Sequence, residues 1–140
     1  MIIIDTNVVS ELLRPKPEPR VERWLSNQDG LTIHLTAISE AELRHGLAIM
    51  PAGKRRAALI DAVDSILRKD MAGRILAFDS TAARSYALIA AGRRSAGRPI
   101  MHADCQIAAI AHAHGAVVAT RNTPDFEGCE IDLINPWNTK

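Results

Sequence analysis

The stretch Met1–Asn7, with the sequence MIIIDTN, decides the fold that the rest of the chain is expected to adopt. Its apolar residues run without polar alternation, which is typical of a strand buried on both faces of a parallel sheet. The run ends in an acid, Asp5, which a hydroxyl and an amide follow. Ligands of open α/β sheets bind beyond the carboxyl ends of the strands. Asp5 is therefore the first candidate for a functional residue.

Further apolar segments predict strands, and helical patterns separate them. Strands are expected at residues 31–35, 75–78, 116–119 and 130–134. Helices are expected at residues 6–13, 19–28, 36–49, 54–69, 80–94 and 101–114. Strands that alternate with helices, without a hairpin signal, imply parallel pairing through crossover connections. The sequence therefore predicts an α/β fold, a three-layer α/β/α sandwich with a mostly parallel sheet of four to five strands, in a single domain over residues 1–140.

Length and composition restrict the class of protein. The 140 residues are 47% hydrophobic and 24% charged, as in an ordinary globular domain that can bury a core. The formal net charge is +1, so binding to nucleic acid requires a local basic patch. No apolar run is long enough for a membrane span, and Met1 directly before the first strand leaves no room for a targeting segment. We therefore expect a cytoplasmic protein with no membrane partner.

Three further acids occupy unusual positions. Glu42 lies within the apolar stripe that includes Ile38 and Ile49, and Asp104 interrupts the inward face of its expected helix. Asp125 lies in a loop at the carboxyl end of a strand, where loops of this architecture carry function. Taken singly, an acid at such a position also fits a structural role, at a helix dipole or in solvent.

Together with Asp5, these acids form a set of four carboxylates that indicates a metal ion. Two carboxylates about 4 Å apart repel by roughly 4 kcal/mol at an effective dielectric constant near 20. This is a large share of a domain stability of roughly 5–15 kcal/mol. A cation removes the repulsion, and Mg²⁺ or Mn²⁺ suits carboxylate and water ligands without histidine. Spacing along the chain does not place the four acids together, so the metal site is a hypothesis.

The same residues carry a resemblance to a known family. The chain resembles a PIN domain, and in particular the VapC-type and FitB-type toxins of type II toxin–antitoxin systems. The matching motifs are residues 4–7, residues 39–43 with Gly46, residues 103–109, and residues 119–122 with Asp125 and Phe126. Because four motifs occur in the right order and cover essentially the whole chain, the resemblance is specific.

The resemblance implies a Mg²⁺-dependent endoribonuclease, with Mn²⁺ as an alternative cofactor, that leaves a 5′-phosphate and a 3′-hydroxyl. The catalytic and metal-binding acids of the family fall on Asp5, Glu42, Asp104 and Asp125. Of these, Asp5 and Asp104 are the implied primary ligands. The supporting polar residues fall on Thr6, Asn7, Thr120 and Asn122. Arg121 lies inside the same loop and is the basic residue that we expect to contact RNA.

The resemblance also implies partners. Toxins of this family pair with a small antitoxin whose tail wraps the toxin and blocks the metal site, and they form homodimers within larger complexes. The walls of the antitoxin groove are expected on the helix with Val8, Val9, Leu12 and Leu13 and on the helix with Trp24 and Leu25. Trp24 fits a plain core position equally well.

Two other functions compete with this interpretation. A phosphatase of the haloacid dehalogenase type also has an Asp after its first strand, but it needs a second acid at the position of Asn7. A non-catalytic PIN-like scaffold that binds protein or nucleic acid is the other alternative, against which the four intact acids argue. The basic clusters at residues 54–56 and at Arg93, Arg94 and Arg98 fit phosphate binding. Solvated helix faces are the simpler interpretation of both clusters.

Overall fold

A computed structural model describes all 140 residues and contains one sheet of five parallel strands. The strands are β1 (Ile2–Ile4), β2 (Ile33–Thr36), β3 (Ile75–Leu76), β4 (Val117–Ala119) and β5 (Leu133–Ile134). Their order is β3-β2-β1-β4-β5, and each neighbouring pair is parallel. The N-terminal strand is thus the centre of the sheet, and the predicted α/β fold is confirmed.

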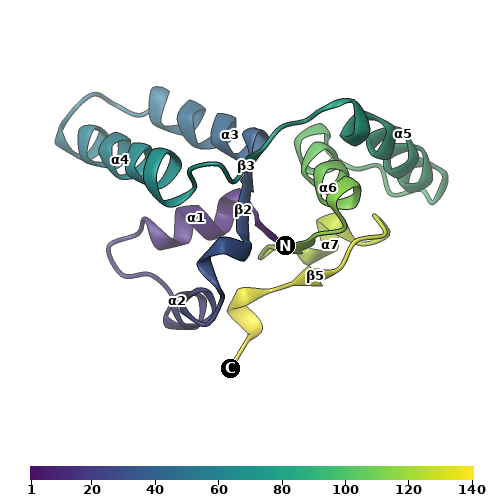
Figure 1. The fold of residues 1–140 in the computed structure, drawn as a ribbon. Helices are drawn as coiled ribbons and strands as arrows, with labels where there is room; N and C mark the ends of the chain where they lie inside the picture. The colour runs from purple at the N-terminus through teal and green to yellow at the C-terminus, as the bar shows by residue number, and fades with distance from the viewer.

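Helices cover the sheet on two sides (Figure 1). The helices are α1 (Thr6–Leu12), α2 (Pro19–Ser26), α3 (Ala37–Ala48), α4 (Lys54–Ser65), α5 (Ser80–Ser95), α6 (His102–His114) and α7 (Thr123–Phe126). The first four lie to the left of the sheet in Figure 1, and the last three lie to its right. No helix combines the length and the apolarity that a bilayer crossing requires.

The two layers of helices create two hydrophobic cores, and β1 contributes to both. Ile3 belongs to the core formed with α5, α6 and α7, whereas Ile4 belongs to the core formed with α1 to α4. Successive residues of a strand point to opposite faces, so a strand between two cores must be apolar throughout. This explains why the first strand of the chain shows no polar alternation.

Polar residues at the ends of strands also begin the following helices. The Oδ1 atom of Asp5 accepts a hydrogen bond from the Thr6 N–H at 2.8 Å, and Thr36 caps α3 through the Ser39 N–H at 3.1 Å. Asp79 caps α5 in the same way, through the Ala82 N–H at 2.9 Å. Each cap fixes the direction in which the chain leaves the sheet.

Some element boundaries differ from the sequence-based expectation. The strand expected at 31–35 begins at Ile33, because Gly30–Thr32 forms a 3-10 turn whose N–H groups bond to Asp29. The strands expected at 75–78 and 130–134 keep only two residues each, Ile75–Leu76 and Leu133–Ile134. The helix expected at 54–69 widens into a π-helical turn at Ile66–Asp70. The ends of the strands depend on pairing with neighbouring strands, which the local sequence does not reveal.

The apolar stripe predicted for α3 is wrong. Ile49 is 70% exposed, and the residues of α3 that are buried are Ser39 and Leu43. The hydroxyl of Ser39 lies 2.9 Å from the Thr6 hydroxyl and 3.4 Å from that of Thr36. A buried polar contact thus accompanies the packing of Leu43 on the inner face of this helix, and apolar spacing alone did not predict it.

Candidate active site

An open pocket, here called the acidic pocket, lies at the carboxyl ends of the central strands β1 and β4. Its volume is about 570 Å³. It is lined by Asp5, Thr6, Asn7, Ser10, Glu11, Arg14, Glu42, Asp104, Arg121, Asn122 and Trp137. Three of the four predicted acids and four of the five predicted polar or basic site residues are in this set. The exceptions are Asp125 and Thr120.

Asp5 is the best-anchored acid of the pocket. It is 6% exposed, and its backbone N–H bonds to the Ala119 carbonyl at 2.9 Å, which continues the pairing of β1 with β4. Its Oδ2 atom accepts hydrogen bonds from the Thr120 hydroxyl at 2.8 Å and from the Asn7 side chain at 3.1 Å. Thr120 thus acts from behind the pocket, on the carboxylate itself. These bonds hold the carboxylate in one orientation.

Burial outweighs these hydrogen bonds in the electrostatics of Asp5. Removal from water raises the pKa of this carboxyl group, while the bonds from Thr120, Thr6 and Asn7 lower it. The charge of Asp125 raises the pKa further. The net pKa of Asp5 lies above its ordinary value, so the ionised form is destabilised when no cation is near.

Asp104 lies in the first turn of α6 and faces the same pocket. Partial burial, followed by the charges of Asp5, Asp125 and Glu42, raises its pKa to about 6. The positive charge of Arg93 opposes this shift only weakly, as the smallest of the causes. The charges of the other three predicted acids therefore all act on Asp104, which their positions in the sequence suggested but did not establish.

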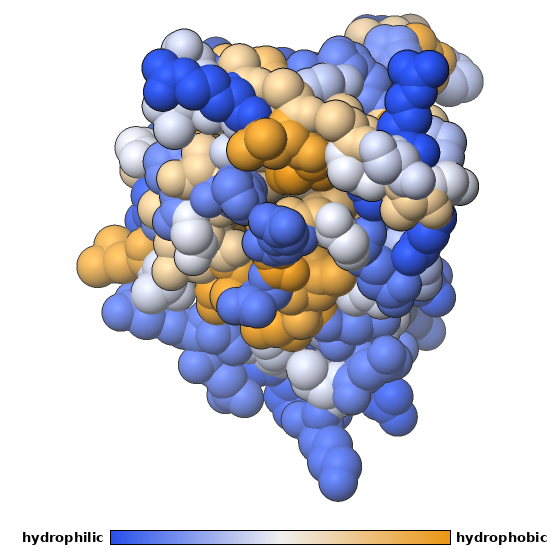
Figure 2. All heavy atoms as spheres, turned by 90° about the vertical axis from the view of Figure 1, so that its right-hand side faces the viewer, coloured by the Kyte–Doolittle hydropathy of each residue, from blue (hydrophilic) through white to orange (hydrophobic).

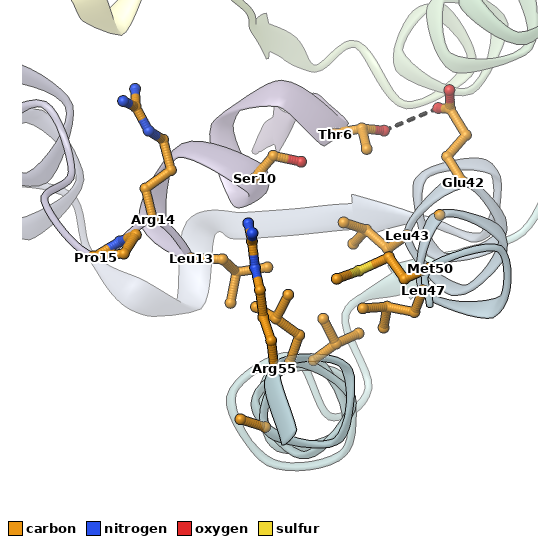
Figure 3. Close-up of a pocket in the computed structure, with 14 residues that line it drawn as sticks. Thr6, Ser10, Leu13, Arg14, Pro15, Glu42, Leu43, Leu47, Met50 and Arg55 are labelled. Atoms are coloured by element: carbon orange, nitrogen blue, oxygen red, sulfur yellow. Dashed lines mark hydrogen bonds between the residues drawn. The ribbon is translucent and has the colours of Figure 1, made fainter. Parts of the chain in front are cut away.

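Glu42 reaches the pocket from α3 and is exposed. Its Oε1 atom lies 2.9 Å from the Thr6 hydroxyl, a contact that links α3 to the start of α1 (Figure 3). The expectation that Glu42 interrupts an inward stripe is thus wrong, because the helix turns this residue to the rim of the pocket. Thr6 and Ser39 together position it, and Ser39 was not predicted as a site residue.

Asp125 lies in α7 and does not line the acidic pocket, although its charge affects Asp5 and Asp104. Arg93 holds its segment: the Nη1 atom of Arg93 donates to the carbonyls of Asp125 at 2.9 Å and Glu127 at 2.8 Å. Arg93 is only 6% exposed, so its assignment to a solvated helix face is wrong. A usable signal was present, since Arg93 follows the buried Ile89 by one helical turn.

No three His, Cys, Asp or Glu side chains of the structure are grouped closely enough to enclose a metal ion. This arrangement still suits Mg²⁺, which keeps several water ligands and is commonly held by only one or two carboxylates. The donor set consists of carboxylate oxygens, without histidine or thiol, which is the set that hard divalent cations prefer. Burial and neighbouring carboxylates raise the pKa of Asp5 and of Asp104, and a cation held between the two groups would favour their ionised forms.

A second cavity, here called the apolar groove, opens beside the acidic pocket between α1, α3 and α4 (Figure 3). It measures about 580 Å³, and Thr6 and Glu42 line both cavities. Its apolar lining comes from Leu13, Leu43, Leu47, Met50, Ala58, Leu59 and Val63. Of the two expected groove walls, the first contributes Leu13 to this cavity, whereas its Val8 and Val9 are buried in the core. The wall expected on α2 is wrong, because Trp24 is buried in the core and no residue of α2 lines the groove.

Comparisons with known proteins agree with this arrangement. A sequence model of the family described as "PIN domain" matches residues 2–127. The VapC ribonuclease Y4jK of Sinorhizobium fredii is 48% identical over 137 residues, which cover 98% of each chain. The toxin FitB of Neisseria gonorrhoeae is 41% identical over 138 residues, which cover 99% of each chain.

The fold has a close counterpart among solved structures. A chain in the structure described as FitAB bound to an IR36 DNA fragment superimposes with a TM-score of 0.94 at 40% identity. The match covers 100% of this chain and 98% of that chain. The likeness therefore includes every element that lines the acidic pocket and the apolar groove.

Proposed function

The chain belongs to the PIN-domain family, and from this premise we propose that it is a divalent-metal-dependent endoribonuclease that acts as the toxin of a type II toxin–antitoxin module. The observation that carries the proposal is the electrostatic coupling of Asp5, Glu42, Asp104 and Asp125 beside one pocket. The names of the two relatives, a ribonuclease and a toxin, support the same activity and role. The proposal includes a cytoplasmic location, because the RNA substrate is found there.

In this proposal Asp5 and Asp104 would hold Mg²⁺, or Mn²⁺ in its place, and Glu42 and Asp125 would assist them from beside the ion. The ion supplies an activated water and neutralises charge that develops on the phosphodiester. Thr120 and Asn7 fix the rotamer of Asp5 through their hydrogen bonds to Oδ2. The expected products carry a 5′-phosphate and a 3′-hydroxyl.

Thr6 and Asn122 keep the remaining polar groups in place. The Thr6 hydroxyl contacts Glu42, so Glu42 stays at the rim, where an attacking water can be oriented. The N–H of Asn122 donates to the Thr120 hydroxyl at 3.1 Å, which leaves the hydroxyl hydrogen for Asp5. The polar residues thus form one connected network behind the acids.

The apolar groove is the proposed docking site of the antitoxin. It adjoins the acidic pocket through Thr6 and Glu42, so a segment bound there can reach the acids and exclude RNA. An amphipathic segment suits such a groove, with its apolar side chains between α1, α3 and α4. A basic residue at the end near Glu42 would compete with the metal for the carboxylates.

A second apolar surface fits the expected homodimer. Figure 2 looks onto the right-hand side of Figure 1, where α5 and α6 lie, and shows an apolar patch surrounded by hydrophilic side chains. Leu88 in α5 and Met101 at the start of α6 are 71% and 76% exposed. Exposed apolar surface of this kind is typical of protein–protein contacts.

The activity is tested with purified protein and total cellular RNA. We expect site-specific cleavage with Mg²⁺ or Mn²⁺ and none with EDTA. Mg²⁺ should also raise the melting temperature, since a ligand at a hundred times its Kd stabilises the native state by about 2.7 kcal/mol. Absence of cleavage under both ions would favour the non-catalytic scaffold. The haloacid dehalogenase alternative is excluded by membership of the PIN-domain family.

The docking site is tested with a charge placed in the apolar groove. Ala58→Glu adds a carboxylate to the lining, and desolvation of that charge should prevent the partner from docking. Ala57→Glu is the matched control, because Ala57 is also exposed on α4 and does not line the groove. Co-expression with the gene immediately upstream should protect cells from the Ala57→Glu protein and fail to protect them from the Ala58→Glu protein. Equal protection would remove the groove from the proposal.

A further inference from the structure

Arg121 is a cation that forms no ion pair, although it lines a pocket of carboxylates. None of the salt bridges of the structure includes it, and its guanidinium makes no hydrogen bond. Instead, its Cζ atom lies 5.3 Å from the ring centroid of Trp137. The other arginine of the pocket, Arg14, pairs with Glu11 at 3.2 Å. The guanidinium of Arg121 is thus kept on an aromatic ring beside acids that could attract it.

A continuous set of hydrogen bonds holds the Arg121 backbone and Trp137 in place. The N–H of Arg121 donates to Asn7 Oδ1 at 3.3 Å, and Asn7 in turn donates to Asp5. On the other side, the Asn135 side chain donates to the Arg121 carbonyl at 3.4 Å and accepts from the Trp137 N–H at 3.0 Å. These bonds connect the backbone of Trp137, through Arg121 and Asn7, to the carboxylate of Asp5.

Trp137 is also anchored from outside the pocket. The Nη1 atom of Arg20 in α2 donates to the Trp137 carbonyl at 3.3 Å, and the half-buried ring packs against the core under α1 to α4. It is the one hydrophobic residue that lines the acidic pocket. A ring at this place offers a flat apolar surface over which the guanidinium of Arg121 lies.

We propose that Arg121 binds an RNA phosphate next to the scissile one, and that Trp137 is the positioning residue that holds Arg121 at the mouth of the acidic pocket. The guanidinium lies over the ring without a hydrogen bond, so its N–H groups are free to donate to the oxygens of a phosphate. The ring also keeps the guanidinium away from the carboxylates, where it would displace a metal ion. This inference rests on the proposed function, because it assumes that RNA enters this pocket.

The test measures binding without cleavage. The Asp104→Asn protein in Mg²⁺ is titrated into a short fluorescein-labelled oligoadenylate, and anisotropy is read between about 50 and 200 mM salt. Arg121→Met should weaken binding about tenfold, as expected for a lost hydrogen bond to a charged group. It should also reduce the slope of log K against log salt by about 0.7, the value for one phosphate contact on a single strand. Arg68→Met is the control, since Arg68 is exposed and forms no ion pair.

A double-mutant cycle tests whether Trp137 acts on RNA binding through Arg121 or only stabilises the fold. Trp137→Leu should weaken binding severalfold and Trp137→Phe should preserve most of it, because phenylalanine keeps an aromatic face. In the Arg121→Met background, Trp137→Leu should add no further loss, because its effect passes through Arg121. Thermal melts accompany each variant and report whether it is folded.

Several results would overturn the inference. They are an unchanged salt slope for Arg121→Met, additive losses in the double variant, and no measurable binding of the oligoadenylate by the parent protein. A Trp137→Leu protein that binds RNA normally but releases its protein partner would assign the ring to that partner instead. Failure of the proposed function is a separate outcome: the wild-type protein then fails to cleave total RNA, while the binding cycle still gives the pattern described here.

Discussion

Asp104→Asn is expected to reduce metal-dependent RNA cleavage by at least about a hundredfold, since even the partners of metal ligands cost 10–100-fold when they are removed. The same change should stabilise the metal-free protein at neutral pH. The pKa of Asp104 is raised from 3.8 to about 6 by burial and by neighbouring carboxylates, so the fold disfavours its ionised form. A pKa shift of this size corresponds to a destabilisation of the ionised carboxylate by about 3 kcal/mol, and solvent screening at this half-open site reduces that value.

The sign of the pH dependence follows from the same shift. Because the pKa is higher in the folded than in the unfolded protein, folding takes up a proton between about pH 4 and pH 6. The metal-free wild type should therefore lose stability as the pH rises through this range. Asp104→Asn, which has no proton to lose, should not show that part of the dependence.

Thermal melts in EDTA from pH 4 to pH 7, together with cleavage assays in Mg²⁺, measure both effects. Asp61→Asn is the control, because Asp61 is exposed on α4 and forms no ion pair. It should cleave RNA as the wild type does and keep the same pH dependence. Undiminished cleavage by the Asp104→Asn protein would remove Asp104 from the proposed metal site.

Arg93→Met is expected to lower the free energy of unfolding by about 3 kcal/mol, because it leaves several carbonyl groups without a donor. Arg93 donates to the carbonyls of Asp125 and Glu127 through Nη1 and to the Arg98 carbonyl through Nε at 2.6 Å. Methionine keeps much of the volume and provides no donor. Cleavage should also fall, since Asp125 loses the contact that holds its segment.

Urea denaturation compares this variant with Arg94→Met. Arg94 is the next residue of α5, is exposed and forms no ion pair, so its replacement should change stability by less than about 0.5 kcal/mol. Similar losses for the two variants would show that the buried contacts of Arg93 contribute little. If Arg93→Met loses stability but cleaves RNA fully, the contacts of Arg93 stabilise the fold and are not needed to place Asp125 for cleavage.

The sequence by itself determined the succession of strands and helices along the chain and the position of Asp5 at the end of the first strand. Both depend on short-range patterns. The apolar run Ile2–Ile4 is typical of a strand that is covered by helices on both faces. Thr36 and Asp79 each cap a helix by accepting a hydrogen bond from the N–H three residues later. Asp5 and Asp104 were recognisable for a similar reason, since a carboxylate at a strand end or on the inward face of a helix conflicts with its local setting. Glu42 was singled out by an apolar stripe that the structure does not contain.

Only the tertiary structure decided which side chains meet. Asn7 and Arg121 are 114 residues apart, and Arg93 reaches a carbonyl 34 residues away. The rotation of α3, which turns Glu42 to the rim and Ile49 to solvent, is accompanied by the contact between Ser39 and Thr6. Contacts of this kind arise from how whole elements pack. The periodicity of apolar residues within one helix or strand therefore does not predict these contacts.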